Sequence, residues 1–296
     1  MVTFLNRHCS WLRRHPCLLC PVPRARRVLG ITAVSFLRLR DVSIEFPIYQ
    51  GSSRSLKKVL LASSTRGNLG RDARDRINVR ALSHLSFEVR DGERFALIGL
   101  NGAGKTTLLK VLAGVYEPTS GRFTSSGRVS SLLDTNVGFN FDATGRENII
   151  LRGMYMGIHP REMRERAAEV AEFTELGDYL DMPVRTYSAG MMIRLAFAAS
   201  TCTPPDVLLM DEWLTAGDAQ FLEKAQRRVE SFVRTSSILV LASHSLELVQ
   251  QWCNRGILLH QGRTLMIGPV EEVVAAYRRL IEFGAPAGLA TEAAGG

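Results

Sequence analysis

The feature that most constrains the fold is a glycine-rich segment between a short apolar run and an apolar helix. The run Phe95–Ile98 is continuously apolar and compatible with β-structure, which predicts a buried strand. It leads directly into Gly99-Leu100-Asn101-Gly102-Ala103-Gly104-Lys105-Thr106-Thr107. The apolar residues Leu108–Ala113 follow, and they predict a helix that ends before Gly114. The chain must therefore fold from a buried strand into a helix through a loop rich in glycine.

This loop matches G-x-x-x-x-G-K-[ST] in the strand, loop and helix context that gives the pattern its meaning. Its glycines allow the backbone to wrap closely around a polyphosphate, and successive N–H groups with the helix N-terminus supply a positive field. A turn that only caps a helix is the alternative, but every fixed position of the pattern is present. We expect Lys105 to reach the β and γ phosphates and the Thr106 hydroxyl to bind Mg²⁺. The predicted phosphate-binding residues are Gly99, Asn101, Gly102, Ala103, Gly104, Lys105, Thr106 and Thr107.

Two acidic residues follow another apolar run, at the point where its strand should end. The run is Val207–Met210, and Asp211 and Glu212 come directly after it. Alone, two acids in this position usually mark a strand that meets solvent. Beside a phosphate-binding loop, however, Asp211 suits the outer shell of Mg²⁺, and Glu212 suits orientation or deprotonation of the attacking water.

The patterns along the chain predict an α/β fold with a parallel sheet. The runs 207–210 and 238–242 read as strands on either side of a helical stretch at about 220–233, and strand, helix, strand implies a parallel pair. Strands are expected at 36–46, 81–89, 95–98, 207–210 and 238–242, and helices at 108–113, 160–176, 188–199 and 220–233.

Three segments stand outside this pattern. Residues 1–34 are rich in arginine and interrupted by prolines, which predicts a poorly ordered, dispensable leader: a transit peptide or an extension from a misassigned start codon. Residues 50–78 are rich in Ser, Arg and Gly and predict a surface insertion. Residues 284–296 are rich in Ala and Gly and predict a flexible tail.

The net charge of +8 arises at the start of the chain. Residues 1–40 carry eight arginines and no acidic residue, whereas the whole chain has 37 basic and 29 acidic residues, so the remainder is neutral. Because recognition of DNA or RNA needs a basic face on the folded domain, no nucleic-acid partner is expected. Five cysteines without dense spacing indicate a reducing compartment and no cysteine metal site. No apolar run is long enough to span a membrane, so a membrane role would come through a partner.

Three further segments resemble motifs of ATP-binding cassette (ABC) proteins. Tyr187-Ser188-Ala189-Gly190-Met191 resembles their signature motif, Thr215-Ala216-Gly217-Asp218 their D-loop, and Ser243-His244-Ser245 the segment of their switch histidine. With the phosphate loop and Asp211-Glu212, five motifs stand in family order. The resemblance spans residues 37 to about 280. It implies a P-loop nucleotide-binding domain over 35–283, with a mostly parallel sheet core, an antiparallel β edge and a helical subdomain at about 145–200.

The resemblance also implies roles for single residues. Two subunits in this family enclose two ATP molecules, and each signature motif reaches the γ-phosphate held by its partner. A homodimer is therefore expected, in which Ser188, Gly190 and Asp218 contribute to nucleotide binding. His244 would sense the γ-phosphate and act with Lys105 and Glu212 in catalysis. Phe46 would stack on adenine, with Tyr49 as the alternate. By themselves, Ser188 would be only a helix N-cap and His244 only a loop histidine.

Within the family, the chain is most similar to ATPase subunits of bacterial exporters of O-antigen, capsule or teichoic acid. The residues that carry this likeness are Thr144-Gly145-Arg146-Glu147-Asn148-Ile149 and Asp211-Glu212-Trp213-Leu214-Thr215-Ala216-Gly217-Asp218-Ala219-Gln220-Phe221. Two features depart from the family pattern. The glutamine usual before the helical subdomain should fall near Thr135 and is absent, and Ala189 and Met191 replace the usual glycine and glutamine of the signature.

The resemblance implies an ATPase that uses ATP and Mg²⁺, acts as a homodimer and binds a separate integral membrane permease. The expected location is peripheral, on the cytoplasmic face of the bacterial inner membrane, with the glycan contacted mainly by the permease. The alternatives are a soluble non-transport cassette ATPase in translation or DNA maintenance, and an interaction-only cassette with residual activity. Such soluble proteins usually carry two cassettes or long coiled-coil insertions.

In this family a helix of the permease docks in a groove beside the helical subdomain. Here the lining would run from about Thr135 to Asn148 and include Phe139 and Phe141. Either phenylalanine could be an ordinary core residue, since Phe is usually buried. Phe141 lies between the polar Asn140 and Asp142, so we expect it to be exposed and to contact the permease.

Overall fold

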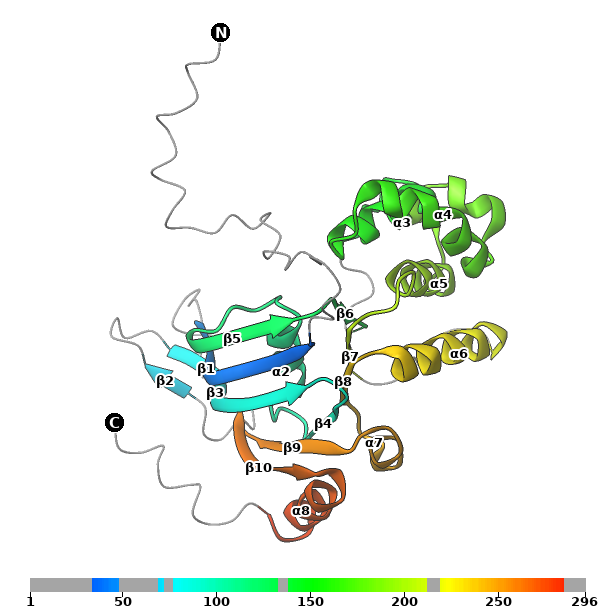
Figure 1. Ribbon diagram of the computed structural model, residues 1–296. Coiled ribbons are helices and arrows are strands. Elements are labelled where there is room, and N and C mark those ends of the chain that lie inside the picture. The colour runs from blue at the N-terminus through cyan, green and yellow to red at the C-terminus, as the bar shows by residue number, and fades with distance from the viewer. Residues whose placement is uncertain (1–33, 48–68, 72–76, 133–137, 212–218, 285–296) are drawn as a thin grey trace, which may run out of the picture. The chain divides into compact units, whose positions relative to one another are not determined.

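The computed structural model describes residues 34–47, 69–71, 77–132, 138–211 and 219–284, and all of them belong to the unit that begins at Val34 (Figure 1). The predicted leader, most of the predicted insertion and the predicted tail from residue 285 lie outside these ranges. The domain boundaries given above therefore stay predictions.

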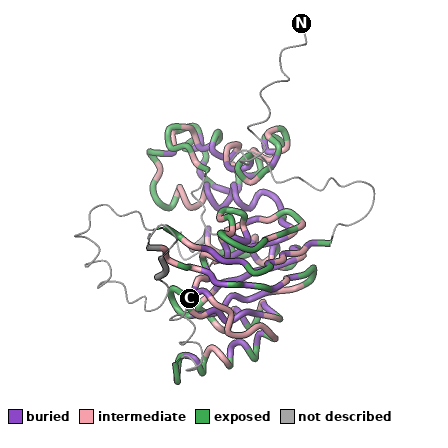
Figure 2. Tube along the Cα trace, turned by 90° about the vertical axis from the view of Figure 1, so that its left-hand side faces the viewer, coloured by how far each residue is buried: buried purple, intermediate pink, exposed green. Residues whose placement is uncertain are grey.

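The core of the fold is a six-stranded sheet with the order β10-β9-β4-β8-β7-β6. The strands are β4 (Arg94–Ile98), β6 (Val129–Ser131), β7 (Val207–Asp211), β8 (Ile238–Ala242), β9 (Arg255–His260) and β10 (Arg263–Pro269). All neighbours pair in parallel except β10 with β9. Strand β8 is buried along its whole length, which explains its continuous apolar sequence. Figure 2 shows where buried, intermediate and exposed residues lie along the chain. The expected parallel pair of 207–210 and 238–242 is confirmed.

A second sheet is antiparallel, with the order β2-β3-β1-β5. Its strands are β1 (Phe36–Pro47), β2 (Leu69–Arg71), β3 (Ile77–Arg90) and β5 (Ser120–Ser126). Strand β3 begins four residues before the predicted Ala81, because residues 78–80 pair with the end of β1. Together with β2, it brings sheet structure into the range where the sequence predicted only a surface insertion.

Helix α2 (Lys105–Leu112) packs between the two sheets. Its residues Leu108, Leu109, Val111 and Leu112 are buried in one hydrophobic cluster with side chains of β1 and β3 on one side and of β7 and β8 on the other. A helix that packs against sheets on two sides buries much of its surface, which accounts for the apolar residues in Leu108–Ala113. This packing fixes the loop that precedes α2.

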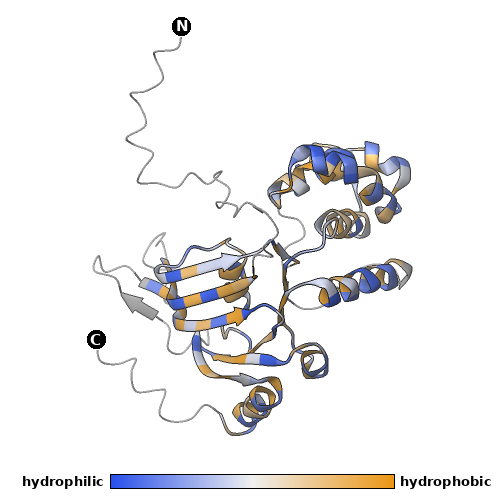
Figure 3. Cartoon of the chain, viewed as in Figure 1, coloured by the Kyte–Doolittle hydropathy of each residue, from blue (hydrophilic) through white to orange (hydrophobic). Residues whose placement is uncertain are grey.

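The other helices cover a second hydrophobic cluster on the central sheet. They are α3 (Gly145–Tyr155), α4 (Pro160–Thr174), α5 (Ala189–Ser200), α6 (Ala219–Thr235), α7 (Leu246–Trp252) and α8 (Val270–Phe283), with short 3₁₀ turns at Gly177–Asp181 and Val184–Thr186. In Figure 3 the ribbons of α4 and α6 carry both hydrophilic and hydrophobic residues, as expected of helices with one buried face. Among the described residues, no helix is both long and apolar enough to cross a membrane.

Local sequence explains where the predicted helices begin and end. Pro160 occupies the first turn of α4, and the helix ends when Glu175 adopts a left-handed conformation (φ 56°), two residues earlier than predicted. Helix α5 begins after Ser188, whose side chain accepts a hydrogen bond from the Met191 N–H.

Candidate functional site

The glycine-rich loop joins β4 to α2 as the sequence predicted. Gly102 (φ 77°) and Gly104 (φ 103°) adopt left-handed conformations that favour glycine. Lys105 is the first residue of α2, and its ammonium donates hydrogen bonds to the carbonyl oxygens of Gly99 (2.7 Å) and Leu100 (3.3 Å). Only 9% of Lys105 is exposed. The loop backbone thus curls around a buried cation, which is the arrangement that polyphosphate binding requires.

Strand β3 and the turn between β9 and β10 pack against this loop. The turn between β9 and β10 contributes Gly262 (φ 76°), whose N–H donates to the Ala103 carbonyl (3.0 Å) and whose carbonyl accepts from the Ser83 N–H (2.8 Å). A Cβ on Gly262 would collide with the Ala81 carbonyl, and a Cβ on Gly104 would lie 2.8 Å from the Leu82 side chain. The loop, β3 and the β9–β10 turn therefore approach one another at backbone distance, which the sequence had not indicated.

The two predicted Mg²⁺ ligands meet at the end of β7. The Thr106 hydroxyl donates a 2.7 Å hydrogen bond to Asp211 Oδ2, although the two residues are 105 positions apart. A hydroxyl and a carboxylate are both hard oxygen donors of the kind that Mg²⁺ prefers. Glu212, the next residue, lies outside the described residues, as do Asp218 and Thr135.

Strand register explains why His244 belongs to the same edge. Ala242, the last residue of β8, pairs with Leu97 on β4 and with Asp211 on β7. Because these strands are parallel, the loop after β4, the acid at the end of β7 and the residues after β8 emerge together. His244 is exposed, and beside it Ser245 caps α7 by accepting from the Leu248 N–H (3.3 Å).

The predicted adenine-stacking residue lies at the end of β1. Phe46 is 38% exposed, and its ring meets Tyr116 edge-on with centroids 5.3 Å apart. The Lys110 ammonium lies 5.5 Å from the centre of the Tyr116 ring. Tyr116 was not predicted as a site residue. The only signal in the sequence is an aromatic residue shortly after the helix of the phosphate loop. Tyr49, the alternate to Phe46, lies outside the described residues.

The predicted signature residues lie on another part of the fold. Ser188, Ala189 and Gly190 form the exposed start of α5, which packs against α3 and α4. No atom lies within 4 Å of a Cβ built on Gly190. The exposed N–H groups of a helix start attract anions. Ser188 is thus an N-cap, as the simpler interpretation held, and it also presents an open helix terminus to solvent.

The segment predicted to contact a permease is organised by Asn148. This residue is fully buried, and its side chain donates to the carbonyls of Asn140 (2.8 Å) and Thr144 (2.9 Å) and accepts from the Asn140 N–H (2.7 Å). Phe141 is 54% exposed on the loop held in this way, whereas Phe139 is partly buried against the main hydrophobic cluster. The expected exposure of Phe141 is confirmed, whereas Phe139 is only partly buried at the edge of the core.

This loop is also joined to the chain just before the signature. The Arg185 N–H donates to the Phe141 carbonyl (2.9 Å), and the Val184 N–H donates to the Ala143 carbonyl (3.0 Å). Tyr187 donates from its hydroxyl to the Tyr179 carbonyl (2.6 Å), and burial raises the pKa of this phenol, so it stays a donor. Two residues of the exposed loop are therefore bonded to the segment that ends at Ser188.

A phosphate loop, an oxygen-ligand pair and a histidine at one edge of a mostly parallel sheet define the class of P-loop nucleotide-binding proteins. The sequence model of the family described as ABC transporter matches residues 82–215. The chain is 40% identical over 226 residues to the O-antigen export system ATP-binding protein RfbE of Yersinia enterocolitica, a match that covers 76% of this chain and 95% of the relative. The chain belongs to the ABC transporter family of ATP-binding proteins.

Other relatives extend this comparison. The chain is 42% identical over 211 residues to the O-antigen export system ATP-binding protein RfbB of Myxococcus xanthus, covering 71% of this chain and 48% of the relative. It is 35% identical over 215 residues to the teichoic acids export ATP-binding protein TagH of Lactococcus lactis, covering 73% of this chain and 46% of the relative. It therefore spans about half the length of these two relatives and nearly all of the Yersinia protein.

Two solved structures share the fold. An ATP-binding subunit of an ABC transporter superposes with a TM-score of 0.58 at 22% identity, covering 82% of this chain and 93% of that one. A dimeric ATP-binding cassette in a post-hydrolysis state, bound to ADP and Pi, superposes with a TM-score of 0.55 at 18% identity. This match covers 79% of this chain and 98% of that one. The expected α/β cassette fold, with its parallel core, antiparallel sheet and helices, is confirmed.

Proposed function

We propose that this chain is the ATP-hydrolysing, nucleotide-binding subunit of an ABC exporter that moves a polysaccharide or lipid-linked glycan across the cytoplasmic membrane through a separate permease. The observation that carries the ATPase part is the meeting of Thr106 with Asp211 next to the buried Lys105. The substrate class rests on relatives whose names specify export of O-antigen or teichoic acids.

Each residue of the nucleotide site has a chemical task in this proposal. The N–H groups of the glycine-rich loop would bind the phosphates of ATP, and Lys105 would neutralise charge on the β and γ groups. Phe46, and Tyr116 beside it, offer aromatic surface for adenine. The two oxygen donors fit Mg²⁺, which would supply charge neutralisation between the terminal phosphates when bound. Thr106 would hold it directly, and Asp211 would orient its outer shell.

Attack on the γ-phosphate needs a water molecule and a group to orient it. Glu212 follows Asp211, the last residue of β7, in the sequence. We assign it the role of orienting or deprotonating this water. His244, which follows the adjacent strand β8, would contact the γ-phosphate and register its loss.

Dimerisation completes the site in this proposal. The exposed start of α5, with Ser188 and Gly190, is a second place suited to an anion, although the chain already has one at its phosphate loop. A homodimer in which each α5 start meets the ATP on its partner would use both sites, and Asp218 would contribute to nucleotide binding. The dimeric ADP-bound cassette of similar fold supports dimerisation.

The same proposal places the chain at the cytoplasmic face of the membrane. Phe141 and its loop would receive a helix of the permease, which in turn would contact the glycan. ATP binding would close the dimer and move the permease, and hydrolysis would reset it. A neutral body without basic excess fits a protein that binds no nucleic acid.

Co-purification from native membranes tests the export function. The tagged full-length chain would be cross-linked in membranes of its host, solubilised in mild detergent and captured, and the bound proteins identified by mass spectrometry. A multi-span membrane protein that is captured with the wild-type chain but not with Phe141→Asp supports the proposal. Capture of ribosomes, with no membrane protein, contradicts it.

A further inference from the structure

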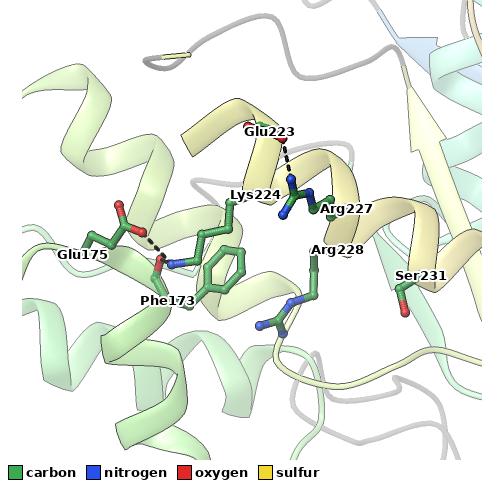
Figure 4. A pocket seen from close by; sticks show the side chains of 7 residues that line it. All are labelled: Phe173, Glu175, Glu223, Lys224, Arg227, Arg228 and Ser231. Atoms are coloured by element: carbon green, nitrogen blue, oxygen red, sulfur yellow. Dashed lines mark hydrogen bonds and ion pairs between the residues drawn. The ribbon is translucent and has the colours of Figure 1, made fainter. Parts of the chain in front are cut away.

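The end of α4 and one side of α6 line an open surface cavity of about 570 Å³ outside the phosphate loop (Figure 4). Its lining comprises Phe173, Glu175, Glu223, Lys224, Arg227, Arg228 and Ser231. Three cations in one cavity are typical of an anion site, but each has a partner: Lys224 pairs with Glu175, Arg227 with Glu223, and Arg228 with Glu169. The pairs of Lys224 and Arg228 join α6 to α4 and the residue that ends it, whereas the pair of Arg227 lies within α6.

The contact between the end of α4 and α6, which we call the joint, comprises Phe173, Glu175, Lys224 and Arg228. Phe173 is its centre. It is 8% exposed, and its ring lies 4.6 Å from the Lys224 ammonium and 4.3 Å from the Arg228 guanidinium. The ring of Phe221 meets it edge-on at 5.9 Å. Residues 221, 224 and 228 are spaced by three and four positions, so they form one face of α6. Cations over an aromatic face are attracted by its quadrupole, and the attraction grows as water is excluded.

Glu175 connects this joint to α5. The left-handed turn at Glu175 ends α4, and its carboxylate accepts from Lys224 of α6 (2.7 Å) and from Arg194 of α5 (3.3 Å). The guanidinium of Arg194 also lies 5.1 Å from the centre of the Phe221 ring. One carboxylate thus links α5 and α6.

A second link lies at the other end of α5. Arg228 donates to the carbonyl of Thr201 (3.0 Å), the residue that ends α5. Helix α6 therefore holds α5 at two points along its length. Helix α6 itself connects β7, which ends in Asp211, to β8, which precedes His244. Through these side-chain contacts, the joint connects the sheet edge of the nucleotide site with the helix that begins after Ser188.

We propose that Glu175 and Lys224 are positioning residues that set the placement of α5, and so of its exposed Ser188 end, relative to the catalytic sheet. This inference rests on the proposed function, in which Ser188 acts on the ATP of a partner subunit. A loosened joint would displace Ser188 without disturbing the phosphate loop of the same chain. A loosened joint therefore lowers the rate of ATP turnover while leaving the affinity of the chain for ATP nearly unchanged.

Substitutions at Lys224, with a matched control, test this separation of turnover from affinity. Lys224→Met keeps most of the side-chain volume and removes the charge that reaches Glu175. We expect kcat to fall by tenfold or more, with the Kd for ATP within twofold of wild type. Lys224→Arg should restore most of the turnover because it keeps the cation. The control is Arg227→Met, which removes a cation of the same cavity and helix whose ion-pair partner, Glu223, lies on α6 itself; it should change neither constant by more than twofold.

Hydrogen exchange provides a readout that does not depend on ATPase activity. Amides of residues 189–192 should exchange faster in Lys224→Met than in wild type, and at the wild-type rate in Arg227→Met. Equal effects of the two substitutions on kcat and on exchange would overturn the inference, as would a changed ATP affinity in Lys224→Met. If the wild-type chain itself hydrolyses no ATP, the proposed function fails, and the exchange comparison still decides whether the joint holds α5.

Discussion

The Thr106 hydroxyl lies 2.7 Å from Asp211 Oδ2, so the first turn of α2 and the end of β7 present two oxygen ligands at one point. Neither residue is unusual in its own segment. Their meeting follows from the order of the parallel strands, which places β8 between β4 and β7 and brings all three carboxyl ends to one edge.

Asp211→Asn should remove the effect of Mg²⁺ on the site. In the wild type, Mg²⁺ should raise ATP affinity and permit hydrolysis. The amide keeps the shape but loses the negative charge that orients the metal shell, so kcat should fall by about 100-fold or more. Titration of ATP with and without Mg²⁺ measures this. Asp206→Asn is the control, since Asp206 precedes the same strand at its other end and accepts from the Arg128 N–H (2.7 Å). Equal losses in the two variants would contradict the ligand role.

Lys105→Ala should abolish or nearly abolish nucleotide binding. Its ammonium is held by the carbonyls of Gly99 and Leu100 and is the side-chain cation placed to meet the β and γ phosphates. Equilibrium binding of a fluorescent ATP analogue gives the affinity, and circular dichroism with the melting temperature checks that the variant is folded. A folded variant with wild-type affinity and turnover would refute the phosphate-loop assignment.

Glu212→Gln should separate binding from hydrolysis. The substitution keeps side-chain size but removes the group assigned to the attacking water, so ATP affinity should persist while turnover falls by about 100-fold. The protein should then accumulate as an ATP-bound dimer, visible by size-exclusion chromatography with light scattering. Hydrolysis at the wild-type rate would show that another residue handles the water.

Gly262→Ala should weaken ATP binding from outside the loop. A methyl group there would meet the backbone of Ala81, and the β9–β10 turn would move away from the Ala103 carbonyl that it now bonds. We expect the Kd for ATP to rise severalfold. Gly92→Ala is the matched control because Gly92 is also left-handed (φ 81°) but has no atom within 4 Å of a Cβ. Gly92→Ala should cost about 1–2 kcal/mol of stability, because an L-residue is disfavoured in the left-handed region, and leave ATP affinity unchanged.

The sequence predicted the elements whose patterns are local. The buried strands β4, β7 and β8 are short apolar runs, and Ser188 and Pro160 are recognisable helix starts, so their segments were assigned correctly. The phosphate loop was predicted because its glycines and Lys105 obey a fixed spacing. Lys105, Thr106, Asp211 and His244 then converge through the strand order, which no local pattern specifies.

What the sequence did not predict depends on contacts between distant segments. Gly262 contacts the phosphate loop only because β3 and the β9–β10 turn lie side by side. A glycine after a strand does not by itself predict this contact. Tyr116 joins Phe46 only because α2 returns the chain beside β1. Glu175 was an ordinary acid at a helix end until the positions of Lys224 and Arg194 gave it two partners.

The last prediction concerns the loop that displays Phe141. Its ring is more than half exposed, while its backbone is bonded to Arg185 and the loop is fixed by the buried Asn148. Such a rigid apolar projection suits the groove contact of a partner helix. Phe141→Asp should therefore weaken permease association and glycan export, with ATP affinity and melting temperature close to wild type.

The same kind of substitution at another exposed apolar residue shows whether the effect is specific to this contact or is a general effect of added charge. Ile281→Asp replaces another exposed apolar side chain, 57% exposed on α8, and should leave association with the permease intact. Co-purification yield and export by cells carrying each variant are the measurements. Normal export by Phe141→Asp would show that Phe141 does not contact the permease. Unfolding of the isolated variant would mark Phe141 as part of the core, since an exposed side chain can accept a carboxylate at little cost in stability.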